Sequence, residues 1–237
     1  MVKLMPIIIL IVSLIVGSVL AAYYLGAVAF PNYQYNLGEY HGGYGMGMMG
    51  NGIQQPRNKI AGLSLNEAVK MIEASLPNAR EFPNNTIVFN STYVNLVVFT
   101  MGAGRAENLT GHEPPYYARG DVFVIGGLID PTIVLPAGAE VHVTVINLDD
   151  NMYHNFVMVT TPPPYPYNVM MNTMIGGGIS MMPLLPPAHY FTSPEVYEGQ
   201  AYSFQYDVSS LPEGQYWYLC TYPGHAQIGM YGELVVE

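Results

Sequence analysis

Residues 214–236 read GQYWYLCTYPGHAQIGMYGELVV, two runs rich in aromatic and β-branched side chains that flank a loop containing Pro223 and Gly224. Runs of this kind, bounded by turn residues, predict β-strands over residues 214–220 and 231–236. Pro and Gly fold a short loop back on itself. We therefore expect the side chains of this loop to converge at one end of a β-structure.

Three side chains of the loop, Cys220, His225 and Met230, follow a C-x4-H-x4-M spacing and offer a thiolate, an imidazole and a thioether. Two histidines and a cysteine with a weak axial methionine form a site that suits copper cycling between Cu(I) and Cu(II). We assign the second histidine to His154, in the sequence YHNF. Cys220 is the one cysteine in 237 residues, so an intramolecular disulfide and a cysteine-rich zinc cluster are excluded. A buried thiol that packs as a small apolar group is the alternative.

Short runs of Val, Ile, Tyr and Phe separated by Gly, Pro and Asn continue through residues 86–237, as is typical of a β-sandwich or barrel. The run EVHVTVIN, residues 140–147, alternates valine with polar side chains, so His142 faces away from the core and is not a predicted ligand. The expected strands are residues 86–90, 93–100, 121–126, 131–135, 139–147, 154–160, 201–208, 214–220 and 231–236. We therefore predict an all-β fold for this region.

Residues 4–30 contain no charged side chain and exceed the roughly 20 apolar residues that a helix needs to cross a bilayer. We expect a transmembrane anchor, with Lys3 inside and the rest of the chain outside. A cleaved signal peptide with Ala27-Val28-Ala29 at its cleavage site is the alternative, although the apolar stretch is long for that role. Both interpretations place the folded part outside the cell membrane.

Two segments separate the anchor from the β-region. Residues 31–58 are rich in Gly, Tyr and Met without periodicity, which predicts a flexible tether. Capture of Cu(I) in transit by His41 and the nearby methionines is a second interpretation of this tether. In residues 59–85, Ser64 and Glu67 form an S-x-x-E capping box, which predicts a short amphipathic helix followed by a linker.

Charged side chains are scarce: 7 Lys and Arg face 17 Asp and Glu, and together they make up 10% of the chain, well under the usual quarter. This composition excludes nucleic acid as an expected partner. A surface made polar by neutral groups suits a strongly acidic exterior, where carboxylates are protonated. Solubility through a net negative charge explains the same composition.

Residues 161–193 form a proline-rich segment too long for a simple hairpin, and long loops of this kind are usually functional or disordered. Its methionines either cover the metal site or pack in the core. They are Met170, Met171, Met174, Met181 and Met182. His189 has no ligand spacing to another residue, and we interpret it as structural.

With these ligands placed, residues 86–237 resemble cupredoxins, and more closely the sulfocyanins of acid-loving archaea; rusticyanins share the C-x4-H-x4-M loop. The resemblance implies a Greek-key β-sandwich and a type 1 (blue) copper held by His154, Cys220, His225 and Met230. It also implies a membrane-anchored electron carrier between a quinol-oxidising complex and a haem-copper terminal oxidase of a respiratory chain.

The same resemblance makes His225, on an exposed loop, the expected electron exit near which redox partners dock. It also implies that Asn155 pins the loop bearing the cysteine. Rusticyanins have Ser at the position of Asn155, which is associated with an unusually high potential, so we expect a more moderate potential here. Four nearby aromatic residues either raise the potential or belong to the core, and for Trp217 we favour the core. They are Tyr216, Trp217, Tyr218 and Tyr222.

Copper enzymes with cupredoxin domains need additional histidines for a catalytic copper. The six histidines include no H-x-H pair, and none is adjacent to Cys220, so we expect no enzymatic activity. A copper chaperone or storage protein is the alternative function, because the methionine-rich segments suit metal capture. Delivery, however, usually requires exposed ligands that exchange readily.

Overall fold

The computed structural model describes residues 59–72, 76–170, 179–192 and 197–237. In this part of the chain, two β-sheets enclose the main core, and two helices, α2 (Leu65–Ile72) and α3 (Ala103–Thr110), pack on the outer face of the first sheet. The predicted anchor and tether lie outside the described residues. Neither of the two described helices has the length and apolar character required to cross a membrane.

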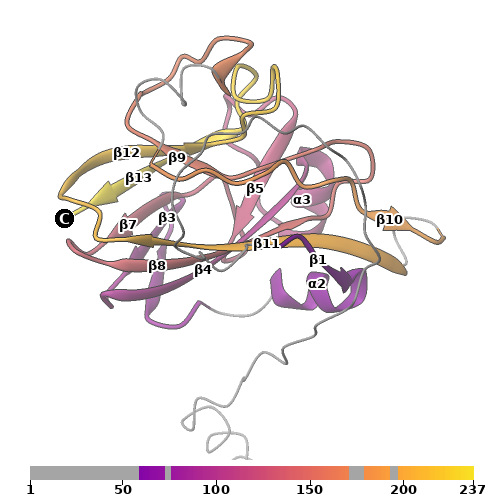
Figure 1. Ribbon diagram of the computed structural model, residues 1–237, viewed down its shortest axis with the longest axis horizontal. Helices are drawn as coiled ribbons and strands as arrows, with labels where there is room; N and C mark the ends of the chain where they lie inside the picture. The colour runs from indigo at the N-terminus through magenta and orange to yellow at the C-terminus, as the bar shows by residue number, and fades with distance from the viewer. Residues whose placement is uncertain (1–58, 73–75, 171–178, 193–196) are drawn as a thin grey trace, which may run out of the picture. The chain divides into compact units, whose positions relative to one another are not determined.

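The strands of each sheet are ordered differently in space and in sequence (Figure 1). The first sheet runs β1 (Ala61–Ser64), β11 (Gly199–Ser209), β8 (Glu140–Asn147), β4 (Tyr93–Gly102), β5 (Asp121–Ile125) and β6 (Leu128–Ile129), with β10 (His189–Tyr190) also paired to β11. The second sheet runs β2 (Ala79–Phe82), β3 (Thr86–Phe89), β7 (Thr132–Leu135), β13 (Tyr231–Val236), β12 (Gly214–Leu219) and β9 (Val157–Val159). Strand β4 pairs in parallel with β8, and β7 pairs in parallel with both β3 and β13, so crossover connections link the sheets.

The main core lies between the two sheets and follows the alternation of side chains along each strand. In β8, Val141, Val143 and Val145 are fully buried in this core. His142 points the other way, and its Nδ1 lies 2.6 Å from Oδ1 of Asp207 on β11. The predicted face of β8 and the surface position of His142 are therefore confirmed.

Helix α2 begins with the predicted capping box. The Ser64 Oγ accepts a hydrogen bond from the Glu67 backbone N–H at 3.3 Å and donates to Glu67 Oε2 at 2.6 Å. Leu65, Ala68 and Ile72 of α2 are buried in a second apolar cluster on the outer face of the first sheet. This packing holds the helix against the sandwich.

Helix α3 was not predicted. It begins without a side-chain cap and ends where Gly111, at φ 72°, donates its backbone N–H to Glu107 O at 2.8 Å. Ala106 of α3 is buried in the same apolar cluster as the buried residues of α2.

Each predicted strand is found, with small shifts at its ends and one larger shift at His154. Four short strands, β1, β2, β6 and β10, were missed. Because β1 pairs with β11 and β2 pairs with β3, residues 59–85 contribute strands to both sheets in addition to the predicted helix.

Candidate metal centre

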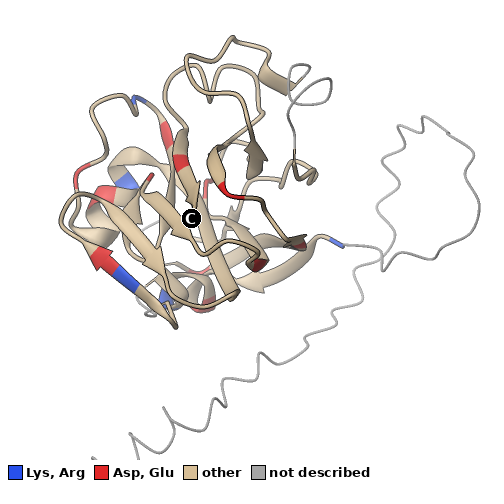
Figure 2. Cartoon of the chain, turned by 90° about the vertical axis from the view of Figure 1, so that its left-hand side faces the viewer, with Lys and Arg blue, Asp and Glu red and all other residues tan. Residues whose placement is uncertain are grey.

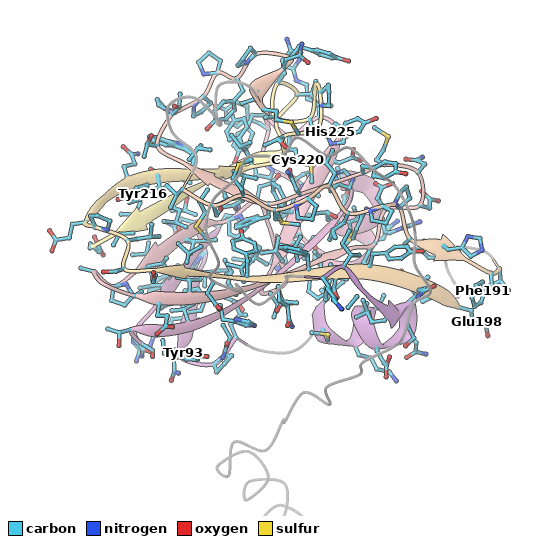
Figure 3. All side chains as sticks on the ribbon, in the orientation of Figure 1. Tyr93, Phe191, Glu198, Tyr216, Cys220 and His225 are labelled. Atoms are coloured by element: carbon cyan, nitrogen blue, oxygen red, sulfur yellow. The ribbon has the colours of Figure 1, made fainter. Side chains whose placement is uncertain are left out.

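The loop between β12 and β13 carries three of the four predicted ligands. Leu219 pairs with Tyr231 across these antiparallel strands, so the loop begins and ends at neighbouring positions. The backbone N–H of Cys220 donates to Met230 O at 3.2 Å, and that of Met230 donates to His225 O at 2.9 Å. These bonds fold the loop into a tight cup, and Figure 3 shows Cys220 and His225 close together at this end of the sandwich.

Gly229 permits the last turn of this cup. Its φ of 113° lies in the region that favours glycine, and a β-carbon at this position would collide with the carbonyl oxygen of Tyr117. The loop therefore packs closely against the segment that precedes β5.

His154 reaches the same point from a separate segment. Its backbone N–H donates to Leu185 O at 3.2 Å, and the N–H of Leu185 donates to His154 O at 2.7 Å. Strand β9 begins only at Val157, so the prediction that His154 lies within a strand spanning residues 154–160 is wrong. The physical reason is that His154 pairs with the proline-rich segment and not with a strand of the second sheet.

The imidazole and thiol groups converge. His154 Nδ1 lies 3.8 Å and His225 Nδ1 lies 3.6 Å from Cys220 Sγ, and these three donor atoms lie within 4.8 Å of one another. Cys220, His154 and Met230 are fully buried, and Met230 packs in the same core cluster as Cys220. Two imidazoles with a thiol and a thioether, all buried, form a donor set that fits copper.

His225 is less accessible than the sequence analysis expects. Only 4% of its surface is exposed, because the Tyr222 ring packs 4.6 Å away and the His154 ring 4.9 Å away, centroid to centroid. The prediction that His225 stands on an exposed loop is therefore corrected. Pro223, Gln227 and Ile228 of the same loop are exposed.

The two histidines differ in their electrostatic environment. Burial lowers the pKa of His154, but the Asp149 carboxylate, Cys220 and Asp121 outweigh burial and raise this pKa to about 9. Burial and the neighbouring His154 lower the pKa of His225 to about 4. In the metal-free protein at neutral pH, His154 therefore carries the proton that a metal must displace.

Asn155 joins the His154 segment to the cysteine loop. Its Nδ2 donates to Thr221 Oγ1 at 2.8 Å, and its Oδ1 accepts the Thr221 backbone N–H at 2.8 Å. Both residues are buried. The expectation that Asn155 pins the loop bearing the cysteine is confirmed.

The methionines of residues 161–193 divide into different environments. Met182 is buried in the core cluster that contains Cys220, and its Sδ accepts the backbone N–H of Phe156 at 3.3 Å. Met181 is 57% exposed, and Met170 is partly exposed. Met182 thus belongs to the core, while Met171 and Met174 lie outside the described residues.

The aromatic residues around the loop are mostly structural. Tyr218 is fully buried and stacks on Phe156, and Tyr216 donates its hydroxyl to Pro212 O at 2.9 Å. Trp217 packs against a small cluster beside β9, as the sequence analysis favours. Of the four predicted aromatic residues, Tyr222 is the one whose ring packs on a proposed ligand.

Two carboxylates beside the histidines were missed. Asp149 Oδ2 lies 3.6 Å from His154 Nε2, and Asp121 Oδ2 lies 3.9 Å from His154 Nε2 and 3.7 Å from His225 Nε2. Asp121, Asp149 and His154 also form a group compact enough to hold a cation. A sequence signal existed only for Asp149, which lies five residues before His154.

A family profile described as the sulfocyanin (SoxE) domain matches residues 126–237, a range that includes all four predicted ligands. Over this range the chain is similar to the sulfocyanin domain. Type 1 copper is accordingly its cofactor, and the converging donors fit this metal.

The sulfocyanin-like domain is also similar to rusticyanins. It is 36% identical over 112 residues to rusticyanin of Acidithiobacillus ferrooxidans (strain ATCC 23270) and 35% identical over 112 residues to that of Acidithiobacillus ferridurans. Each alignment covers 46% of this chain and 51% of the relative, so the chain spans about half the length of the curated relatives it matches.

Solved rusticyanin structures share the fold over a larger part of the chain. Reduced rusticyanin aligns with a TM-score of 0.56 at 23% identity, covering 76% of this chain and 100% of that structure. Rusticyanin from Thiobacillus ferrooxidans aligns with a TM-score of 0.56 at 21% identity, covering 76% and 98%. These alignments establish a cupredoxin-like β-sandwich.

Proposed function

We propose that this protein is a membrane-anchored type 1 copper protein that carries single electrons on the outer face of the membrane. His154, Cys220, His225 and Met230 hold the copper. The observation that carries the proposal is the convergence of two imidazole Nδ1 atoms on the Cys220 thiol, at 3.8 and 3.6 Å, within the buried core. Copper supplies a one-electron couple that soft sulfur ligands and imidazoles both stabilise.

The protein's contribution is to fix these ligands in advance. Backbone hydrogen bonds close the loop between Cys220 and Met230, and Asn155 ties this loop to the His154 segment. Ligands held by β-strands and paired backbone move little when the charge of the metal changes. A small reorganisation favours rapid transfer of an electron.

The chain organisation that supports this function is an anchor (residues 4–30), a tether (31–58), a short helix and linker (59–85) and the copper domain (86–237). The long apolar stretch of residues 4–30 supports the anchor. Fractionation of cells that express the full chain, beside a variant lacking residues 4–30, tests it. We expect the full chain to remain with membranes after a high-salt wash and the variant to be released.

The proposed partners are redox proteins: a quinol-oxidising complex as donor and a haem-copper terminal oxidase as acceptor, both docking near His225. His225 is the proposed ligand with a measurable exposed edge, at 4%, whereas the other three are fully buried. Figure 2 shows Lys and Arg widely spaced among many uncharged residues, which suits recognition through neutral side chains. We propose neither a nucleic-acid partner nor a catalytic reaction.

A copper chaperone or storage protein is the alternative, and burial of the donors argues against it. Delivery requires ligands that an acceptor can reach, but Cys220 and Met230 have no exposed surface. Repeated redox cycling of the copper-loaded full chain in the presence of a Cu(I) chelator separates the two functions. An electron carrier retains its copper, whereas loss of the copper within the first cycles contradicts the proposal.

A further inference from the structure

The outer nitrogens of both proposed histidine ligands face carboxylates. His154 Nε2 and His225 Nε2 are buried and have no hydrogen-bond partner among the described residues. Asp121 Oδ2 lies 3.9 Å from the first and 3.7 Å from the second, and Asp149 Oδ2 lies 3.6 Å from the first. These separations are longer than a direct hydrogen bond, so the interaction at this distance is electrostatic.

Asp149 is fixed in this position by the backbone. Its Oδ1 accepts the N–H groups of Asn151 at 2.9 Å and Met152 at 3.1 Å, which leaves Oδ2 directed toward His154. The Asp149 backbone is held as well, because its N–H donates to Asn147 Oδ1 at 3.0 Å. A turn organised around Asp149 therefore presents one carboxylate oxygen to the first histidine.

Asp121 comes from a different element, the first residue of β5, where it pairs with Gly102 of β4. Its side chain is 17% exposed, so it lies at the edge of the buried site. The same oxygen of Asp121, Oδ2, lies within 4 Å of the Nε2 atoms of both histidines. Asp121 thus couples the orientation of two rings that come from separate loops.

A histidine that binds a metal usually offers its second ring N–H to a carboxylate or a carbonyl group, which fixes the tautomer and ring orientation and makes the ligand more basic. In this site the Nδ1 atoms face the Cys220 sulfur, and the Nε2 atoms face the carboxylates. A negative charge beside the ligands also favours Cu(II) over Cu(I).

We propose that Asp121 and Asp149 are positioning residues that keep the ring proton of His154 and His225 on Nε2 and lower the reduction potential of the copper. This inference rests on the proposed function, because it requires His154 and His225 to bind copper through Nδ1. A copper site whose histidine ligands contact only apolar groups would lack this effect on the reduction potential.

The test compares Asp121→Asn and Asp149→Asn with Asp150→Asn in the copper-loaded full chain at one fixed pH. Asp150 is a suitable control because it carries the same charge next to Asp149 but is 44% exposed and pairs with Arg105 Nη2 at 3.7 Å. We expect each of the first two variants to raise the potential enough to change the Cu(I) to Cu(II) ratio at least tenfold, about 59 mV for one electron. The control should change this ratio less than twofold.

NMR of the diamagnetic Cu(I) form gives a second readout. We expect Nε2–H signals from both rings in the unaltered protein and faster solvent exchange of the His154 signal in Asp149→Asn. If the thiolate-dependent colour is intact but neither the potential nor the Nε2–H signals change, the inference fails and the proposed function stands. If the unaltered protein shows no such colour, the proposed function itself fails.

Metal analysis tests whether Asp121, Asp149 and His154 instead hold a second cation. We expect one metal ion per chain in the unaltered protein and in all three variants. A second ion that is lost on Asp149→Asn would overturn the inference, because a cation at His154 Nε2 would replace the ring proton.

Discussion

Asn155 and Thr221 exchange two hydrogen bonds, each 2.8 Å long, between the residue that follows His154 and the residue that follows Cys220. The pair joins two segments that are 66 positions apart in the sequence. Because each residue lies next to a proposed ligand, this contact sets the distance between the imidazole and the thiol. The geometry of the metal site thus depends on a polar pair that does not bind metal.

Asn155→Ser shortens this side chain and breaks at least one of the two bonds. We expect a higher reduction potential and a loss of about 1 to 3 kcal/mol in the free energy of unfolding, the usual range for a buried group left without its partner. Voltammetry and urea unfolding measure the two effects. Asn151→Ser is the control, because that side chain is exposed. An unchanged potential in Asn155→Ser contradicts the proposed role.

Gly229→Ala tests how tightly the ligand loop packs. The change adds both left-handed strain at φ 113° and a collision with Tyr117 O. Gly138→Ala adds similar strain, at φ 74°, but no atom lies within 4 Å of the new β-carbon. Strain alone costs about 1 to 3 kcal/mol. We expect a larger loss of unfolding free energy in Gly229→Ala, with weaker copper retention, and equal losses in both variants would contradict this packing.

Met182 and Met181 are adjacent residues in opposite environments, 7% and 57% exposed. We expect Met182→Ala to lower the free energy of unfolding by about 2 to 5 kcal/mol, as for other buried methionines. Met181→Ala should change it by less than about 0.5 kcal/mol. Urea unfolding of the two variants measures this contrast. Similar losses in both would show that Met181 also packs against the domain.

We expect the titration of the buried Asp130 carboxyl to make the stability of the fold depend on pH. It is buried, its Oδ1 accepts the Phe123 N–H at 2.9 Å, and its Oδ2 has no hydrogen-bond partner among the described residues. Burial raises the pKa of Asp130 well above its usual value, although the Phe123 hydrogen bond opposes this. Below the unfolded-state pKa of about 3.9 the carboxyl is neutral in both states. As the pH rises toward the folded-state pKa, the unfolded state releases its proton first, and the fold loses stability.

Asp130→Asn removes this titration. We expect the variant to gain stability relative to the unaltered protein as the pH rises from 3 to 7, measured by urea unfolding at several pH values. Glu113→Gln is the control, because that side chain is exposed. A constant difference between Asp130→Asn and the unaltered protein at all pH values would contradict the expected titration.

The β-sandwich could be predicted, and candidate ligands could be identified, because local sequence patterns indicate both. Alternating valines in β8 define its buried face, and the spacing of Cys220, His225 and Met230 is compressed into one loop. Helix α3 was missed because Gly102 provides no side-chain cap, although Gly111 is a recognisable end signal. Short strands such as β1 and β2 form through pairing with distant partners, so their own sequence contains little signal.

The surroundings of the ligands depend on tertiary contacts that sequence spacing does not reveal. Asp121 approaches both histidines because β5 begins beside the cysteine loop, although it is 33 residues from His154 and 104 from His225. The burial of His225 likewise follows from rings that pack on both sides of it. Sequence reasoning therefore identifies the candidate donors but not the groups that orient and shield them.

The most direct test of the central claim is the visible absorption spectrum of the full chain loaded with Cu(II), recorded beside Cys220→Ser. We predict an intense blue band in the unaltered protein, a reversible redox couple on the same sample, and loss of the band in the variant. A colourless copper-loaded protein, or a band that survives Cys220→Ser, would contradict a copper site built on this thiolate.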